Sequence, residues 1–157
     1  LLRPYDAGLV SATQYWQQIA EAAGREIGDI AGAIEAEVVG WSNADAEMVE
    51  YVRGLVARVP VGVLSDAPVE VIEMLERTQP WLTDLPVAIY SARVGRCKPD
   101  PEVYRLALAG LGLAPEDVFF TDDRPGNVAA AQALGMPAAV FTGLDALRRL
   151  VEAHLVG

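Results

Sequence analysis

The chain contains one cysteine, Cys97, and one histidine, His154, among 157 residues. A single cysteine excludes an internal disulfide framework and is typical of a reducing compartment, so we expect a cytoplasmic protein. The usual zinc sites combine several cysteine or histidine ligands, which one chain of this composition does not supply. His154 falls on a predicted surface helix and is a poor catalytic candidate. Cys97 lies between Arg96 and Lys98, whose positive charges would favour a reactive thiolate, although an incidental cysteine is the more common case.

Long apolar runs and an excess of positive charge are also missing. No run approaches the roughly 20 apolar residues of a membrane-spanning helix, and the N-terminus lacks the basic and then apolar pattern of a secretory signal. We therefore expect no membrane partner. The formal net charge of −10 argues against nucleic acid as a partner, because it would repel the phosphate backbone. An anionic substrate would have to be bound by local donors or by a metal ion.

The hydrophobic pattern divides the chain near residue 60. Residues 1–58 show helical periodicity without a strand, whereas residues 59–157 alternate strands with helices. Strands are expected at 61–65, 87–91, 118–122 and 138–141. Short, fully apolar strands between helices are typical of a parallel sheet that is covered on both faces. We predict an α/β fold, a doubly wound Rossmann-like sheet with a small helical cap in front.

Local capping patterns place several helix ends. Ser11 and Gln14 form a capping box, and Gly24 provides the stop of the same helix. A later helix in the cap has Ser42 or Asn43 as its expected N-cap. In the sheet region, an N-cap followed by proline at the first helical position is predicted at Asp100 and Pro101.

Polar residues gather where the predicted strands end. Ser65 and Asp66 follow the first strand, Asp122 and Asp123 end the third, and Lys98 lies in the loop after the second. In open parallel sheets, ligands bind beyond the carboxyl ends of the strands. Carboxylates suit Mg²⁺, which also takes phosphate oxygens and water, and a lysine supplies a point charge for phosphate. The pattern indicates phosphate handling.

Each residue of this group also has an ordinary structural explanation. Asp123 would serve as the cap of the helix that follows it, and Asp122 would be a surface carboxylate. A single lysine such as Lys98 is usually solvated, and a serine such as Ser65 usually belongs to a turn. The functional interpretation depends on the agreement of three strand ends.

Three segments together resemble the haloacid dehalogenase (HAD) superfamily, and most closely its phosphatase-like branch, which includes the N-terminal domain of soluble epoxide hydrolase. These segments are LSDAP (64–68), KPDPEVY (98–104) and DDRPGNVAAAQALGM (122–136). The segment YDAGLVSATQYW (5–16) is similar to the helical cap of that branch. The resemblance covers essentially the whole chain and implies a cap over residues 1–58 and a HAD-like core over residues 59–157.

The resemblance also implies roles for the strand-end residues. Ser65 corresponds to the hydroxyl that hydrogen-bonds the transferring phosphoryl group, and Lys98 to the lysine that neutralises it. Asp122 and Asp123 correspond to the acidic pair that holds Mg²⁺ directly or through water. Asp66 occupies a substrate-binding position where the family usually has asparagine, and an extra carboxylate near a phosphate is unfavourable unless it faces away or is protonated.

One family motif has no counterpart in the sequence. The family's nucleophile is the first aspartate of a D-x-D motif on an initial central strand, and no Asp-x-Asp occurs here. Without that strand, its two neighbours lack a pairing partner. We expect an N-terminal segment beyond Leu1 to supply the strand and the attacking aspartate. The alternatives are a strand borrowed from a second copy, which requires a homodimer, and a degenerate, non-catalytic member.

The leading hypothesis is a parent protein that is a Mg²⁺-dependent phosphatase of small phosphorylated metabolites, with the present chain inactive by itself. Tyr15, Trp16 and Trp41 are aromatic candidates for the substrate-facing surface of the cap, although packing against the core explains them more simply. A metal-free 2-haloacid dehalogenase is disfavoured, because those members do not keep the acidic pair. A non-catalytic phosphate-binding or dimerising module remains open. A receiver-type signalling domain has its acidic pair and lysine in the reverse order.

Overall fold

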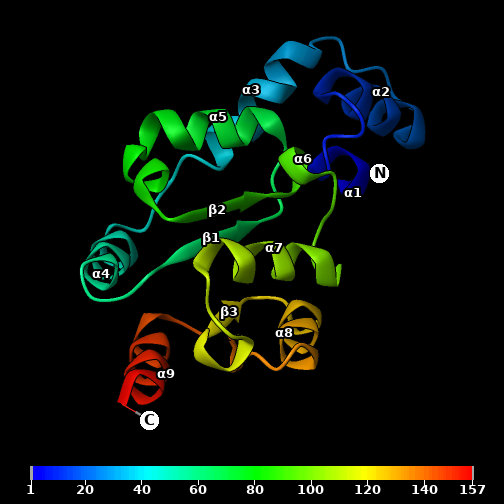
Figure 1. Cartoon of the computed structure of the whole chain (residues 1–157). Helices are drawn as coiled ribbons and strands as arrows, with labels where there is room; N and C mark the ends of the chain where they lie inside the picture. Colours follow the sequence, from blue (N-terminus) through cyan, green and yellow to red (C-terminus); the bar gives the residue numbers. More distant parts are fainter. Residues whose placement is uncertain (1, 157) are drawn as a thin grey trace.

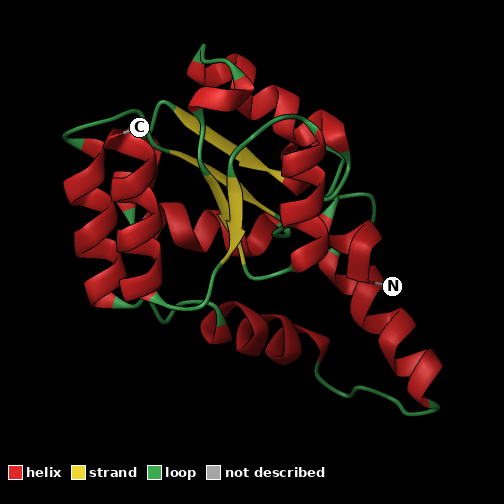
Figure 2. Ribbon diagram, turned by 90° about the horizontal axis from the view of Figure 1, so that it is seen from below, coloured by secondary structure: helices red, strands yellow, loops and turns green. Residues whose placement is uncertain are grey.

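Short parallel strands lie at the centre of the molecule, and helices surround them (Figure 2). The computed structural model describes residues 2–156. The strands are β1 (Gly62–Ser65), β2 (Val87–Tyr90), β3 (Phe120–Asp122) and β4 (Ala138–Val140). β1 pairs in parallel with β2, and β3 with β4. This arrangement confirms the predicted α/β fold with a Rossmann-like core.

Each strand pair is connected through its own helix. α5 (Val69–Thr78) links β1 to β2, and α8 (Pro125–Ala133) links β3 to β4. α7 (Pro101–Leu111) contacts both strands of the first pair and also α8, so it lies between the two units (Figure 1). The shorter elements are α6 (Ser91–Val94), η1 (Pro80–Asp84) and η2 (Pro115–Asp117).

The core consists of two apolar clusters, one for each strand pair. The first joins α5 to β2 and includes Ile72 and Tyr90, which are about 1% exposed. The second joins α7 to α8 around Tyr104, which is fully buried. The Tyr104 hydroxyl donates to the Asn127 carbonyl at 2.9 Å, and its ring meets Phe120 edge-on. The first cluster includes Ala67, which follows Asp66, and the second packs against Leu64 of β1 and Phe120 of β3.

Four helices precede the first strand: α1 (Leu2–Asp6), α2 (Ala12–Ala23), α3 (Ile30–Gly40) and α4 (Ala46–Val56). The capping box of Ser11 and Gln14 is present, and Gly24 ends α2 in the left-handed conformation, as predicted. The expected cap at Ser42 or Asn43 is wrong. Asp45 caps α4 because its carboxylate accepts the Glu47 and Met48 N–H groups.

The four N-terminal helices dock at different places on the core. α1 contacts α6, and α3 contacts α5. α4 and the turn after it reach the C-terminal helix α9 (Leu144–Val156) through exposed ion pairs, Glu47 of α4 with Arg148 and Arg58 of the turn with Glu152. α2 and α3 thus stand at one end of the molecule and α9 at the other (Figure 1). The boundary of a separate cap at residue 58 stays a prediction.

Within residues 2–156, β1 is hydrogen-bonded to β2, and β3 to β4. β1 and β3 are not hydrogen-bonded to each other in this part of the chain. A further strand between them, and the homodimer that would provide it from a second copy, stay predictions. No helix in the described part of the chain combines the length and apolar character that crossing a bilayer requires.

Candidate active site

Lys98 connects the ends of two strands that belong to different pairs. Its Nζ donates to the Leu64 carbonyl of β1 at 2.9 Å and to Asp122 Oδ2 of β3 at 2.6 Å. Only 11% of the Lys98 side chain and 6% of the Asp122 side chain are exposed. Lys98 is the only lysine of the chain. The alternative of a solvated lysine is therefore wrong, and the ammonium lies at the junction of the two strand pairs.

Three groups hold Asp122 in addition to its place at the end of β3. Besides Lys98, the Arg124 N–H and the Asn127 side-chain amide donate to its Oδ1 at 2.8 and 2.9 Å. Burial alone would raise the pKa of the Asp122 carboxyl, but these hydrogen bonds and the charge of Lys98 outweigh it and lower the pKa. Asp122 is thus a buried, ionised carboxylate, and the alternative of a surface carboxylate is wrong.

Asp66 fastens the loop that carries Lys98. Its Oδ1 accepts the Lys98 backbone N–H at 2.9 Å, an interaction that needs an acceptor oxygen and that asparagine provides equally well. The Lys98–Pro99 peptide bond that follows is cis. Ser65 is the last residue of β1 and is partly exposed at the same edge. The structure thus brings Ser65, Asp66, Lys98 and Asp122 together.

The environment of Asp123 differs from that of its neighbour Asp122. It is exposed, and the N-cap position of α8 is Arg124, whose side chain makes no capping bond. The alternative of Asp123 as a helix cap is therefore wrong, since Asp122 accepts the nearby N–H group instead.

The acidic pair has the donor chemistry of a magnesium site. No group of three or more His, Cys, Asp or Glu side chains suited to a metal occurs within residues 2–156. Mg²⁺ does not require one, because it commonly binds through one or two carboxylates together with phosphate oxygens and water. Asp122 keeps acceptor capacity on Oδ2 beside Lys98, and Asp123 is open to solvent. The residues fit the ion.

The remaining candidates include Cys97 and the aromatic residues Tyr15 and Trp16. Burial, followed by the charges of Asp66 and Asp6, raises the pKa of the Cys97 thiol, so the hypothesis of a reactive thiolate is wrong. Tyr15 stacks on Tyr5 with ring centroids 4.4 Å apart. Trp16 meets Tyr15 edge-on.

Two of the remaining residues lie away from the strand ends. Trp41 follows α3 and is 65% exposed. His154, on α9, lies against Phe119 and the Asp117 carbonyl.

Three residues of this region, Asn127, Ser91 and Asp6, were not predicted from the sequence. Asn127 orients Asp122 from the first turn of α8. The hydroxyl of Ser91, which is 2% exposed, accepts the Ala67 N–H at 2.9 Å and donates to the Asp6 carbonyl. Asn127 lies in the quoted motif DDRPGN and was within reach, whereas the roles of Ser91 and Asp6 depend on tertiary contacts.

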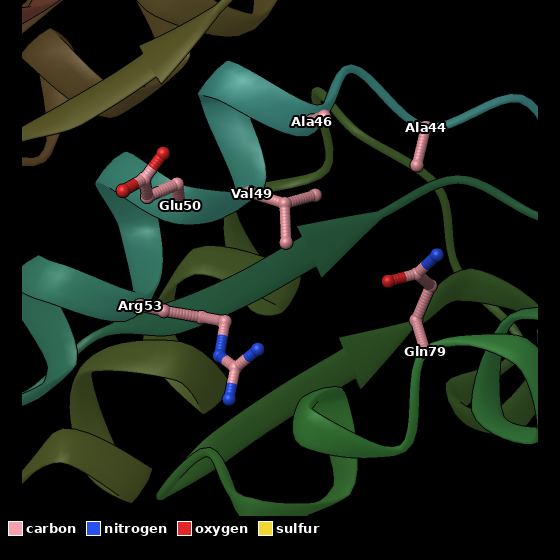
Figure 3. Close-up of a pocket in the computed structure, with 6 residues that line it drawn as sticks. All are labelled: Ala44, Ala46, Val49, Glu50, Arg53 and Gln79. Atoms are coloured by element: carbon pink, nitrogen blue, oxygen red, sulfur yellow. The ribbon is translucent and has the colours of Figure 1, made fainter.

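A surface hollow of about 450 Å³ lies elsewhere, beside α4 and the end of α5 (Figure 3). It is lined by Ala44, Ala46, Val49, Glu50, Arg53 and Gln79. Gln79 follows α5 and precedes β2, so this hollow lies at the opposite end of the strands from Lys98 and Asp122. It is not part of the site.

Residues 5–135 match the family model of the haloacid dehalogenase-like hydrolases, and the chain belongs to this family. It is 32% identical over 99 residues to validoxylamine A 7'-phosphate phosphatase of Streptomyces hygroscopicus subsp. limoneus, covering 63% of this chain and 46% of that protein. It is 30% identical over 156 residues to the sesquiterpene phosphatase astK of Aspergillus oryzae, covering 98% of this chain and 78% of that protein. The match thus spans less than half of the Streptomyces relative.

The fold is similar to that of a HAD family enzyme from Bacteroides thetaiotaomicron, solved in complex with magnesium and inorganic phosphate. The TM-score is 0.70 at 19% identity, and the match covers 87% of this chain and 72% of that one. The chain therefore shares the fold of this family of hydrolases and has phosphatases among its relatives.

Proposed function

We propose that this chain supplies the phosphate- and magnesium-binding face of a phosphatase for small phosphorylated metabolites. The observation that carries the proposal is the buried contact of Lys98 with Asp122, which lies at the strand ends beside Ser65. Two relatives that are named phosphatases, and a similar fold solved with magnesium and phosphate, support it. Local charge matters here because the net charge of −10 repels an anion from a distance.

The roles follow from the chemistry of each group. The Ser65 hydroxyl donates to a phosphoryl oxygen, and the Lys98 ammonium neutralises the phosphoryl charge. Asp122 and Asp123 hold Mg²⁺, which supplies positive charge to the phosphate oxygens when it is bound. Asp66 holds the Lys98 loop in place through the Lys98 N–H.

Binding tests the proposal without any assumption about turnover. We expect the 157-residue chain to bind inorganic phosphate by isothermal titration calorimetry in the presence of Mg²⁺, and to bind it at least tenfold more weakly with EDTA or as the Asp122→Asn variant. Asp145→Asn is the matched control, because it removes the same charge from a side chain on α9 that is 86% exposed. Phosphate binding that ignores both EDTA and Asp122→Asn would refute the proposed site.

The attacking group is a separate question. Family members attack phosphorus with an aspartate of a D-x-D motif, and we assign no nucleophile among residues 2–156, which contain no Asp-x-Asp. A non-catalytic phosphate-binding module is the second candidate, and this absence favours it. We expect p-nitrophenyl phosphate to be hydrolysed no faster than background by the 157-residue chain, with Mg²⁺ or with EDTA. Magnesium-dependent turnover that Asp122→Asn abolishes would instead identify another carboxylate, Asp66 first, as the nucleophile.

A further inference from the structure

The backbone of Asp6 is fixed next to the loop that carries the site. The buried Ser91 hydroxyl bonds both the Asp6 carbonyl and the N–H of Ala67, the residue after Asp66. One hydroxyl oxygen therefore joins the end of α1 to the β1–α5 loop. The Asp6 and Asp66 carboxylates are close enough for the charge of Asp66 to act on Asp6.

The packing of α1 leaves this position little freedom. Gly8 has φ +69°, and a Cβ at this residue would lie 2.6 Å from the Ala92 carbonyl oxygen. The backbone just after α1 thus rests directly on α6. The Cys97 thiol adds a contact with the Arg3 carbonyl at 3.7 Å. Contacts at Arg3, before Asp6, and at Gly8, after it, thus fix the position of α1.

The Asp6 carboxylate has no hydrogen-bond donor among the described residues, although the residue is half-buried. Burial, and then the negative charge of Asp66, raise its pKa to about 6, and the positive charge of Arg124 opposes them. The charge of Glu37 makes a smaller contribution in the same direction as Asp66. A half-buried carboxylate without a donor destabilises the fold. The presence of Asp6 is therefore better explained by a function than by stability.

An aromatic surface adjoins this acceptor. Tyr15 lies close enough for the Asp6 charge to contribute to its raised pKa, after burial and Glu37. The Tyr15 ring stacks on Tyr5, whose hydroxyl donates to Glu37 at 3.2 Å. The junction of α1, α2 and α3 therefore combines negative charge with aromatic faces, beside a phosphate site that is positively charged at Lys98.

We propose that Asp6 is a specificity-determining residue, whose carboxylate accepts a hydrogen bond from the leaving group of the phosphate ester and rejects esters that carry a second anionic group. The inference deepens the proposed function and rests on it. The substrate class is then a phosphate monoester with an ammonium or hydroxyl group near the ester oxygen. Esters with a carboxylate or second phosphate in that place are disfavoured by repulsion from Asp6 and Asp66.

Two probes of nearly equal size separate the alternatives. Ethanolamine phosphate carries an ammonium group two carbons from the ester, whereas phosphoglycolate carries a carboxylate there. We expect the wild-type 157-residue chain with Mg²⁺ to bind ethanolamine phosphate more tightly by calorimetry. In Asp6→Asn, the ratio of the two dissociation constants should move towards phosphoglycolate by about tenfold or more, as expected for loss of a hydrogen bond to a charged group.

Matched variants complete the experiment. Asp84→Asn removes the same charge from an exposed residue of η1, which precedes β2 at the other end of the sheet, and should leave the ratio unchanged. Asp6→Ser is a second variant that should shift the ratio in the same direction. An unchanged ratio in both Asp6 variants, while inorganic phosphate still binds, overturns the specificity role alone. Failure of the wild-type chain to bind inorganic phosphate overturns the proposed function, and this inference with it.

Discussion

Asp122 and Asp6 both lie near the loop of Cys97 and Lys98, and the fold shifts their pKa values in opposite directions. Asp122, at the end of β3, is more deeply buried, yet its pKa is lowered. Asp6, at the end of α1, is less buried, yet its pKa is raised to about 6. The difference lies in the partners, since Asp122 receives hydrogen bonds from Lys98, Arg124 and Asn127.

The comparison shows that burial does not by itself decide whether a carboxylate is charged. A buried carboxylate stays ionised where donors replace the water that it has lost. Donors of the protein itself therefore stabilise the Asp122 carboxylate, whereas the Asp6 carboxylate has no donor among the described residues. The same distinction applies to neutral groups such as the hydroxyls of Tyr90 and Tyr104, two buried residues.

The largest expected effect comes from removing the partner of Asp122. Lys98→Met should lower the free energy of unfolding by about 3 kcal/mol at pH 7, because it leaves a buried carboxylate without its counter-charge. Urea denaturation measures the change. Arg105→Met is the control, since Arg105 pairs with Glu102 in an exposed contact at 3.4 Å and should cost less than about 1 kcal/mol.

The pH dependence of this difference has a defined sign. Because the pKa of Asp122 is lowered on folding, its stabilisation is present above its unfolded pKa of about 3.9 and is lost as the pH falls through the lower folded value. The gap between wild type and Lys98→Met should therefore narrow in acid. Equal losses in Lys98→Met and Arg105→Met at pH 7 would mean that the ion pair is not buried in solution.

Asp6 should behave in the opposite sense. Its folded pKa of about 6 exceeds the ordinary value of 3.8, so the folded state binds more protons between these values and stability falls as the pH rises through them. Asp6→Asn should stabilise the protein at pH 7.5 by about 1 kcal/mol after allowance for solvent screening, and should have little effect at pH 3. Urea denaturation of Asp6→Asn and Asp84→Asn at both pH values provides the check. A destabilised Asp6→Asn at pH 7.5 would contradict the unpartnered carboxylate.

The smallest effects should come from two buried tyrosine hydroxyls. Tyr104→Phe removes the bond to the Asn127 carbonyl and should cost about 1 kcal/mol. Tyr90→Phe should be neutral or stabilising, because the Tyr90 hydroxyl is buried without a hydrogen-bond partner in the described structure. Thermal unfolding of the two variants side by side would show whether partners, rather than burial, set the cost. A larger loss in Tyr90→Phe would reverse this expectation.

Much of the fold was predictable because it follows from local patterns. The capping box of Ser11 and the proline at the start of α7 each depend on a few adjacent residues. The cap of α4 was wrong because Ser42, Asn43 and Asp45 are all suitable cap residues, and only the backbone geometry selects Asp45. α1 was missed because five residues carry no periodicity, and its place depends on Ser91 and α6.

The features of the site also divide into those that local sequence predicts and those that depend on tertiary contacts. Ser65, Lys98 and Asp122 were predicted together, since parallel strands place their carboxyl ends at one edge. The sequence could not show that Lys98 bonds the Leu64 carbonyl, nor that the Ser91 hydroxyl bonds the Asp6 carbonyl across 85 residues of chain. Such contacts depend on how the elements dock.

The division of the strands into two pairs also has a consequence for the order of folding. β1 and β2 are joined through α5 and η1, and β3 and β4 through α8, so each unit is one continuous segment of chain. The Lys98 contacts span 34 and 24 residues and require both units to be in place. Because the ammonium bonds one group from each unit, and consecutive motifs tend to form cooperative units of their own, we expect the two units to collapse first and the ammonium to enter its position between them late.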